Sequence, residues 1–170
     1  MRVVGGSLRG RRLLAPEDAS VRPTSDRARE SLFAILTQGR VAEGRSPLLD
    51  AHVLDAFAGT GALGIEALSR GAAKASFLEK SSAALAVLRQ NLRELGLVRE
   101  GVVIQGDALL PARAREAASI VLLDPPYQSG LAAPALAALE RAGWIAAEAL
   151  ISVELDKTEA FEPPPGFAVV

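Results

Sequence analysis

The sequence predicts an α/β domain with a mostly parallel sheet and helices on both faces. Three observations support this fold class. Short apolar runs typical of buried strands alternate along the chain with segments whose apolar residues recur at helical spacing. One apolar run leads into a glycine-rich turn and then a helical pattern. Another ends in Asp-Pro-Pro-Tyr, and ligands bind in open parallel sheets at the carboxyl ends of the strands.

The first half of the chain is predicted to hold an arm, two helices and two strands. Glycines at positions 5, 6 and 10 indicate a bent strand or hairpin. Thr24 or Ser25 can cap the first helix, and Gly71 follows the second. The expected elements are, in order, a helix at about 25–38, a strand at 52–57, a helix at 62–70 and a strand at 75–79.

The second half begins with an amphipathic helix that Ser81 or Ser82 caps and Gly96 ends. Its leucines recur at helical spacing and are expected in the core: Leu85, Leu88, Leu92 and Leu95. The remaining elements are expected at 102–106 (strand), 111–117 (weak helix), 119–124 (strand), 131–142 (helix) and 149–155 (strand). Residues 167–170 look like the start of one more strand.

The segment from Val53 to Gly64 is predicted to be a strand, a glycine-rich turn and the start of a helix. Gly59, Gly61 and Gly64 match a nucleotide-binding fingerprint, and Glu79 follows Gly59 by twenty residues, at the expected ribose position. Glycine leaves no Cβ between backbone and ligand, and the helix start offers free N–H groups. The order of elements predicts a nucleotide-like ligand, with a purely structural turn as the alternative.

Two ligand classes fit such a turn, because NAD and S-adenosylmethionine both present an adenosine. NAD carries a pyrophosphate for the helix N-terminus, whereas S-adenosylmethionine carries a sulfonium and an amino group. Asp55, four residues before the first glycine, suits a cationic amino group and would repel a pyrophosphate. We therefore expect S-adenosylmethionine as the cofactor, with nicotinamide chemistry as the alternative.

The tetrapeptide Asp124-Pro125-Pro126-Tyr127 follows the apolar run 120–123 and contains the only tyrosine of the chain. The prolines restrict the backbone, so the Asp124 carboxylate and the Pro125 carbonyl can point outward as hydrogen-bond acceptors. The Tyr127 ring can stack on a base. We predict that these residues hold and orient an exocyclic amine; an ordinary strand-ending turn is the alternative.

With both motifs, the chain resembles the class I S-adenosylmethionine-dependent methyltransferases that act on exocyclic amines. Within that class, residues 5–13 and 22–33 are similar to the opening of RsmD-type 16S rRNA guanine-N2 methyltransferases, and Gly143-Trp144 falls where those proteins carry it. The resemblance spans residues 2–154. It implies a Rossmann-like class I methyltransferase fold, S-adenosyl-L-methionine as cofactor, and a guanine N2 amine of 16S rRNA, free or in the assembling small ribosomal subunit, as target. Class I methyltransferases usually add a C-terminal hairpin, which is incomplete in this sequence and would leave a bare sheet edge.

The motifs and the resemblance together define the expected site residues. The expected catalytic residues are Asp124, Pro125, Pro126 and Tyr127. The resemblance puts Asp107 near the adenine amino group. The expected cofactor-binding residues are Thr24, Arg29, Asp55, Ala58, Gly59, Gly61, Glu79, Lys80, Asp107, Ala108 and Asp124.

Charge is unevenly distributed along the chain. Residues 1–45 carry a net charge of +4 and the rest a net charge of −5, although the whole chain is at −1. This asymmetry indicates an arginine-rich arm and helix at 1–45, part of the same domain as an S-adenosylmethionine-binding catalytic body at 46–170. The expected RNA-binding residues, which would grip phosphates without reading bases, are Arg2, Arg9, Arg11, Arg12 and Arg22. A solvated basic tail is the alternative.

Composition argues against several other classes. The chain has no cysteine, and His52 has no companion at ligand spacing, so no metal is expected. There is no apolar run of about 18 residues and no signal-type N-terminal segment, so a cytoplasmic enzyme is expected. A monomer is also expected.

Three alternative functions remain open from the sequence. An adenine-N6 DNA or RNA methyltransferase would share Asp-Pro-Pro-Tyr, but the DNA enzymes are expected to carry a further recognition domain. A protein-glutamine methyltransferase would resemble Asn-Pro-Pro-Tyr, whereas this chain has Asp124. A non-catalytic RNA-binding assembly module with the same fold is the third.

Overall fold

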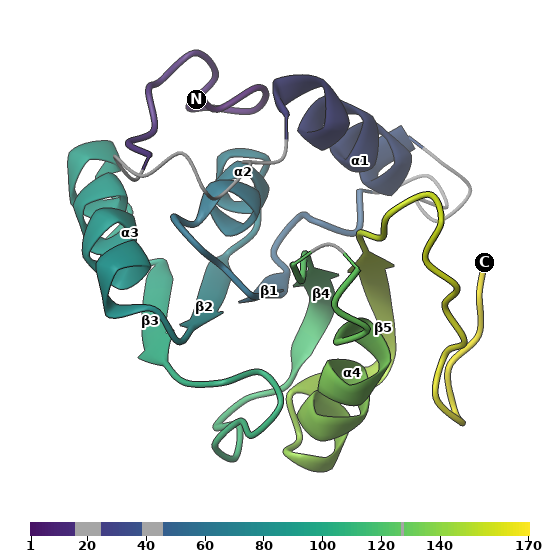
Figure 1. The fold of residues 1–170 in the computed structure, drawn as a ribbon. Helices are drawn as coiled ribbons and strands as arrows, with labels where there is room; N and C mark the ends of the chain where they lie inside the picture. Colours follow the sequence, from purple (N-terminus) through teal and green to yellow (C-terminus); the bar gives the residue numbers. More distant parts are fainter. Residues whose placement is uncertain (16–24, 39–45, 127) are drawn as a thin grey trace.

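The computed structural model describes residues 1–15, 25–38, 46–126 and 128–170 (Figure 1). Four helices and five strands alternate along these parts of the chain. Their bounds are α1 (Asp26–Gln38), β1 (His52–Ala56), α2 (Ala62–Ser69), β2 (Lys74–Glu79), α3 (Ser82–Leu95), β3 (Gly101–Gln105), β4 (Ala118–Leu123), α4 (Ala132–Arg141) and β5 (Ile145–Val153). The expected α/β order is confirmed except between β3 and β4, where no helix intervenes.

The five strands form one parallel sheet in the order β3-β2-β1-β4-β5. Strand β1 pairs with β2 on one side and with β4 on the other, so the strand order reverses beside β1. In open α/β sheets such a reversal opens a crevice at the carboxyl ends of the strands. The registers align Ala56 with Leu78 and with Leu123, which brings the ends of these three strands together.

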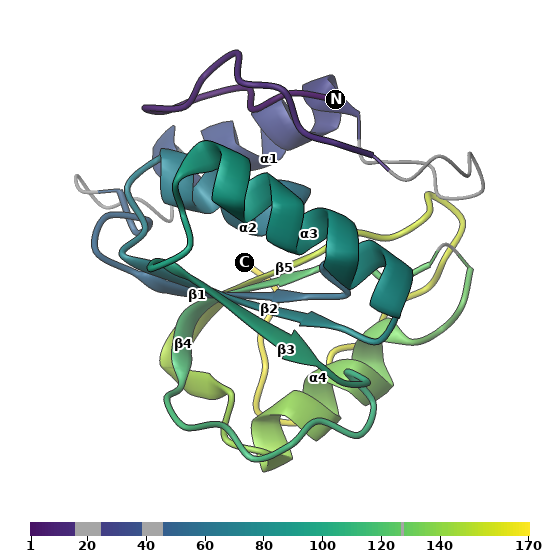
Figure 2. The ribbon, with the colours of Figure 1, turned by 90° about the vertical axis from the view of Figure 1, so that its left-hand side faces the viewer.

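Helices cover both faces of the sheet (Figure 2). The N-terminal segment, α1, α2 and α3 lie on one face, and α4 lies on the other. Each face has its own apolar core. Phe33, Ile65, Phe77 and Leu88 belong to the first core, and Leu136 belongs to the second. Strands β1, β2 and β4 are buried almost throughout, which is why they read as continuous apolar runs.

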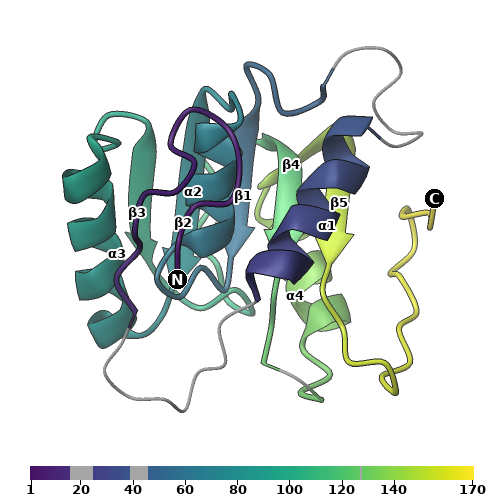
Figure 3. The ribbon, with the colours of Figure 1, turned by 90° about the horizontal axis from the view of Figure 1, so that it is seen from above.

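The predicted N-terminal hairpin is confirmed. Arg2 forms an antiparallel bridge with Arg12, and the Val3 N–H donates to the Arg11 carbonyl at 2.9 Å. Gly6 and Gly10 adopt φ of 75° and 85°, a left-handed conformation that favours glycine. We call residues 1–14 the N-terminal hairpin. It lies across α2 and α3 (Figure 3).

The predicted helix caps are confirmed at three positions. The Ser25 side chain accepts from the Ala28 N–H at the start of α1, and the Ser81 side chain accepts from the Ala84 N–H at the start of α3. Gly96 ends α3 with φ 73°. The four leucines expected on the inner face of α3 are all buried. Local capping chemistry therefore sets these helix ends.

The predicted weak helix at 111–117 is wrong, because this segment is an irregular loop. Its backbone groups bond elsewhere. The Ala112 carbonyl accepts from the Trp144 indole Nε1 at 2.8 Å, and the Ala114 N–H donates to the Ala142 carbonyl at 2.9 Å. These bonds to the end of α4 replace the helical ones.

The C-terminal region also differs from the expectation. Strand β5 begins at Ile145 instead of 149, and its pairing with β4 is interrupted, since β4 advances from Ala118 to Ile120 while β5 advances from Ile145 to Leu150. Residues 167–170 form no strand.

Within the described ranges, no helix combines the length and apolar character needed to cross a membrane.

Candidate functional site

The candidate site lies at the carboxyl edge of the sheet, where four strands end. Strand β1 leads into the glycine turn, and Asp124 directly follows β4. Since Ala56 pairs with Leu123, Phe57 and Asp124 are the next residues on neighbouring strands. Strand β2 ends in Glu79 beside Gln105, the last residue of β3. The expected cofactor and amine motifs are therefore adjacent.

The glycine turn needs unusual backbone conformations. Phe57, Gly59 and Gly61 have φ of 66°, 54° and 86°, and Gly61 is the residue preceding α2. Left-handed backbone at a non-glycine residue such as Phe57 stores strain, which proteins tend to hold at functional sites. A Cβ on Gly64 would overlap the Phe77 ring, so this glycine allows α2 to approach the sheet closely.

Gly59 leaves an open surface at the tip of the turn. A Cβ built on Gly59 would meet no heavy atom within 4 Å. Its backbone faces free space, as a cradle for a ligand requires. The turn is closed from within by the Gly61 N–H, which donates to the Ala58 carbonyl at 2.7 Å, while the Ala58 N–H donates to the Leu78 carbonyl at 3.1 Å.

Asp55 lies beneath the turn. Its side chain is 1% exposed, and its Oδ2 accepts a hydrogen bond from the Gly64 N–H at 2.8 Å. Burial raises the pKa of Asp55 to about 7, the Gly64 hydrogen bond opposes that rise, and the nearby Asp124 and Glu79 carboxylates add to it. The sequence predicts that Asp55 binds the cofactor directly. In the structure its carboxylate also stabilises the start of α2 through the hydrogen bond to Gly64.

Glu79 links the turn to α3. Its Oε2 accepts from the Gly59 N–H and its Oε1 accepts from the Ser81 N–H, each at 2.8 Å. A carboxylate has about four acceptor positions, so Glu79 can still receive hydroxyl groups. The carboxylates of Asp55, Glu79 and Asp124 gather at this edge of the sheet, and the last two add to the rise in the pKa of Asp55 that burial mainly causes.

Asp107 and its neighbours form the next side of the site, after β3. The Asp107 Oδ1 accepts from the Leu109 N–H at 2.9 Å, which fixes the carboxylate. Its Oδ2 lies 3.9 Å from the Lys80 Nζ, in a pair exposed enough to contribute little to stability. Ala108 is buried in the core that α4 covers.

The tetrapeptide itself is only partly described. Asp124 is half-buried, Pro125 is buried and Pro126 is exposed. Asp124 has an interaction partner in the structure. Tyr127 lies outside the described residues, as do Thr24 and Arg22, so their expected roles stay predictions.

Arg29 was expected to bind the cofactor, but its contacts in this structure are structural. The side chain is fully buried. Its Nη2 donates to the Arg2 carbonyl at 2.7 Å and to the Asp26 Oδ1 at 2.6 Å. The guanidinium thus ties α1 to the N-terminal hairpin. Sequence reasoning could not find this role, because the partner carbonyl of Arg2 lies 27 residues away.

The hairpin presents the expected RNA-binding arginines at the surface. Arg2, Arg9, Arg11 and Arg12 are all exposed. Arg2 pairs with Asp26 at 3.4 Å, and the Arg11 Nη2 donates to the Glu94 carbonyl at 3.0 Å. Among the described residues, the side chains of Arg9 and Arg12 have no hydrogen-bond or ion-pair partner, so both are available to an anion.

Sequence reasoning missed two residues that organise the site, Asn91 and Glu159. Asn91 is buried on α3, where its Oδ1 accepts from the Leu14 N–H at 2.8 Å and its Nδ2 donates to the Thr60 carbonyl at 3.0 Å. It joins the hairpin to the glycine turn. A polar residue on the leucine face of a helix was the available signal. Glu159 contacts the loop after the tetrapeptide and offers no such signal.

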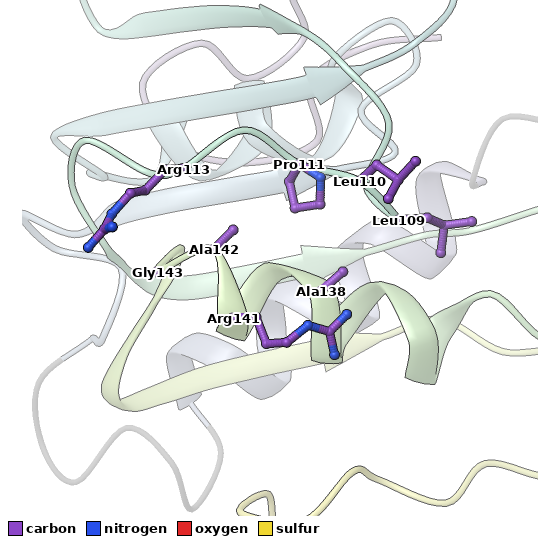
Figure 4. Close-up of a pocket in the computed structure, with 8 residues that line it drawn as sticks. All are labelled: Leu109, Leu110, Pro111, Arg113, Ala138, Arg141, Ala142 and Gly143. Carbon is purple, nitrogen blue, oxygen red and sulfur yellow. The ribbon is translucent and has the colours of Figure 1, made fainter.

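A separate cavity of about 450 Å³ lies between α4 and the loop after β3 (Figure 4). Its lining includes Leu110, Arg113 and Arg141 and none of the predicted site residues.

In the described parts of the chain, no three His, Cys, Asp or Glu side chains gather as a metal site would require.

The chain is similar to known proteins along its whole length. A family model described as conserved hypothetical protein 95 matches residues 1–170. The chain is 42% identical over 154 residues to ribosomal RNA small subunit methyltransferase D of Escherichia coli strain K12, covering 91% of this chain and 74% of that protein. Its counterpart of the same name in Haemophilus influenzae is 34% identical over 175 aligned positions, covering 100% and 86%. A solved structure of a candidate methyltransferase from Escherichia coli has a TM-score of 0.80 at 37% identity, over 99% of this chain and 88% of that one.

Proposed function

The chain belongs to the conserved hypothetical protein 95 family and is an RsmD-type methyltransferase of Rossmann-like class I fold, and from that membership we propose that it methylates the exocyclic N2 amine of a guanine in 16S rRNA. The observation that carries the proposal is the position of Asp124. It follows β4 directly, beside the strand that leads into the glycine turn. An amine held there would lie next to a cofactor held by the turn.

We propose S-adenosyl-L-methionine as the cofactor because the residues fit its charge. Three carboxylates at the site favour a cationic sulfonium and ammonium and disfavour a pyrophosphate. The open backbone at Gly59 would receive the nucleoside, Glu79 the ribose hydroxyls, and Asp107 with Ala108 the adenine. When bound, this cofactor supplies a methyl group on an activated leaving group.

The protein contributes positioning and electrostatics. An exocyclic purine amine is a poor nucleophile because its lone pair is delocalised into the ring. Hydrogen bonds from the amine to the Asp124 carboxylate and the Pro125 carbonyl would localise that lone pair and orient it. Tyr127 would stack on the base, a contact worth roughly 1–3 kcal/mol. Because a paired base hides its amine, the target guanine must lie in a loop or be flipped out.

RNA is proposed to reach the site along the N-terminal hairpin. Residues 1–45 would act as a basic arm and helix within the same domain as the catalytic body at 46–170. Exposed Arg9 and Arg12 support this proposal, because their side chains have no partner among the described residues. Their contacts would be to phosphates and would position the RNA without reading its sequence.

The test is methyl transfer by Asp124 variants. Labelled S-adenosylmethionine is incubated with unmodified small-subunit particles, naked rRNA or DNA, and the products are identified by nucleoside analysis. We expect N2-methylguanosine from the wild type and none from Asp124→Ala, with cofactor affinity retained. Asp124→Asn should keep partial activity because the amide oxygen still accepts a hydrogen bond.

The control is Glu116→Ala, which removes an exposed carboxylate next to the opposite end of β4. Near-wild-type methylation by Asp124→Ala would contradict the amine-holding role. N6-methyladenosine as the product would support an adenine-N6 methyltransferase instead, and RNA binding without transfer would support a non-catalytic assembly module.

A further inference from the structure

The chain after β5 contacts the loop that follows the amine-holding tetrapeptide. The Glu154 N–H donates to the Leu123 carbonyl at 2.8 Å, so the chain leaves the sheet beside the end of β4. Five residues later, the Glu159 carboxylate reaches that loop. The Gln128 N–H donates to Oε2 at 3.3 Å, and the Gly130 N–H donates to Oε1 at 3.2 Å.

This loop lies at the protein surface. A pocket of about 450 Å³ lies beside its contact with the C-terminal segment. The cavity is lined by Gln128, Gly130, Thr158, Glu159 and Ala160. Gln128 and Gly130 are both exposed, and they adopt left-handed φ of 55° and 64°. Left-handed backbone at Gln128 costs energy, so the surrounding contacts must maintain this turn. Those contacts include the two hydrogen bonds to Glu159.

Glu159 is itself held in a fixed turn. The Asp156 Oδ1 accepts from the Thr158 N–H at 2.9 Å and from the Thr158 hydroxyl at 2.6 Å, and the Glu159 N–H donates to the Asp156 carbonyl at 3.0 Å. The hydroxyl and amide of Thr158 lower the pKa of Asp156, and the Gln128 side chain contributes to that shift. The segment 156–159 therefore presents the Glu159 carboxylate in a defined position.

We propose that Glu159 is a positioning residue for methyl transfer, which acts by holding the 128–130 turn and through it the amine-holding residues 124–127. The proposal rests on the proposed function of that tetrapeptide. Both hydrogen bonds are longer than the roughly 2.7–2.9 Å typical of a charged acceptor. Hydrogen bonds at catalytic sites are often long before the substrate binds and tighten in the complex.

A purely structural role for Glu159 would predict a loss of stability, whereas a positioning role predicts a loss of kcat alone. The two amides that donate to Glu159 belong to exposed residues, so water can replace the carboxylate when it is removed. Global stability should then change little. A misplacement of about 1 Å at a reacting group can nevertheless lower the rate by about 100-fold. Loss of Glu159 should therefore lower kcat without lowering stability.

The experiment compares Glu159→Ala and Glu159→Gln with Glu162→Ala, which removes an exposed carboxylate three residues further along. For Glu159→Ala we expect kcat to fall about 10- to 100-fold, with the KM for S-adenosylmethionine within about twofold and Tm within about 2 °C of the wild type. Glu159→Gln should recover part of kcat, since it keeps one acceptor oxygen. Glu162→Ala should match the wild type.

Hydrogen–deuterium exchange gives a readout that needs no activity. The amides of Gln128 and Gly130 should exchange faster in Glu159→Ala than in the wild type. Their exchange rates should be unchanged in Glu162→Ala. Wild-type kcat in Glu159→Ala, unchanged exchange, or an equal loss of kcat in Glu162→Ala would each overturn the proposal.

Asp124→Ala, assayed alongside, separates the two proposals. If Asp124→Ala is inactive and Glu159→Ala is fully active, only the positioning role fails. If Asp124→Ala is fully active, the proposed function of the tetrapeptide fails, and the role of Glu159 fails with it.

Discussion

At the scale of single residues, three carboxylates share the site but have different surroundings. Asp55 is buried and bonded to the Gly64 N–H, Glu79 bridges two backbone amides, and Asp124 is half-buried at the end of β4. Glu79 and Asp124 are close enough to Asp55 to raise its pKa, although burial is the main cause of that rise. A cation bound among them would relieve this repulsion, which is why the site suits a positively charged cofactor.

The raised pKa of Asp55 predicts a pH-dependent stability. The pKa rises from 3.8 to about 7 on folding, mainly through burial. Below pH 3.8 the Asp55 carboxyl is protonated in both the folded and the unfolded state, and its contribution to stability is fully present. Between pH 3.8 and about 7 it ionises only in the unfolded state, so this contribution is lost as pH rises toward 7. Asp55→Asn, which cannot ionise, should show a profile flatter by on the order of 1 kcal/mol per pH unit in this window.

Urea unfolding of both proteins at pH 5, 6, 7 and 8 checks this expectation. Glu162→Gln serves as the control, because this exposed carboxylate should leave the profile unchanged. Parallel profiles for the wild type and Asp55→Asn would show that Asp55 does not titrate in this range.

At the scale of elements, the N-terminal hairpin is built onto the two helices that flank the glycine turn. The Glu66 and Ser69 side chains of α2 bond the backbone of the hairpin: Oε2 of Glu66 accepts from the Val4 N–H at 2.8 Å, and Oγ of Ser69 donates to the Gly5 carbonyl at 2.6 Å. Asn91 makes the third link, from α3. The proposed RNA-binding element and the proposed cofactor-binding turn therefore share one support.

Removing the Asn91 link should weaken both stability and cofactor binding. Asn91→Ala removes the hydrogen bonds to the half-buried Leu14 N–H and Thr60 carbonyl, and the loss of one such bond costs about 0.5–1.5 kcal/mol. We expect a lower free energy of unfolding and a reduced affinity for S-adenosylmethionine, measured by urea unfolding and calorimetry.

The matched control is Gln90→Ala on the same helix, since the Gln90 side chain is exposed and bonds only Glu94 among the described residues. If Asn91→Ala lost stability but kept wild-type cofactor affinity, Asn91 would support the core alone and not the turn.

At the scale of the whole molecule, the basic N-terminal hairpin lies on one face of the sheet. This is the face that α1, α2 and α3 cover, whereas α4, with Arg141, covers the other (Figures 2 and 4). The chain beyond residue 45 carries a net charge of −5, and the hairpin exposes four arginines. RNA should therefore approach from the hairpin side.

The double variant Arg9→Ala/Arg12→Ala should weaken RNA binding and flatten its salt dependence. Each lost phosphate contact should reduce the slope of log affinity against log salt by about 0.7–0.9. Cofactor affinity should not change. Filter-binding or fluorescence titrations over a range of salt concentrations measure both quantities.

Arg113→Ala/Arg141→Ala is the matched control, because it removes the same charge from the α4 face. An equal loss of affinity in both double variants would indicate a general charge effect and contradict a binding role for the hairpin.

Much of this molecule could be predicted from local patterns. The strand runs, the Ser25 and Ser81 caps and the Gly96 end of α3 are each determined by residues close in sequence. The loop at 111–117 could not be predicted, because its backbone bonds to Trp144 and Ala142, about thirty residues away. For the same reason the bond from Arg29 to the Arg2 carbonyl of the hairpin could not be predicted, whereas its expected role in cofactor binding stays a prediction.

The sequence by itself determined the fold class, the glycine turn and the tetrapeptide that follows β4. Backbone preferences of glycine and proline and the periodicity of apolar residues act over a few residues, so they can be read directly. Only the tertiary structure decided that Asp55 is buried under the turn, that Asn91 joins the hairpin to it, and that Glu159 holds the loop after the tetrapeptide. Those roles depend on which distant backbone groups a side chain meets, and packing alone sets that.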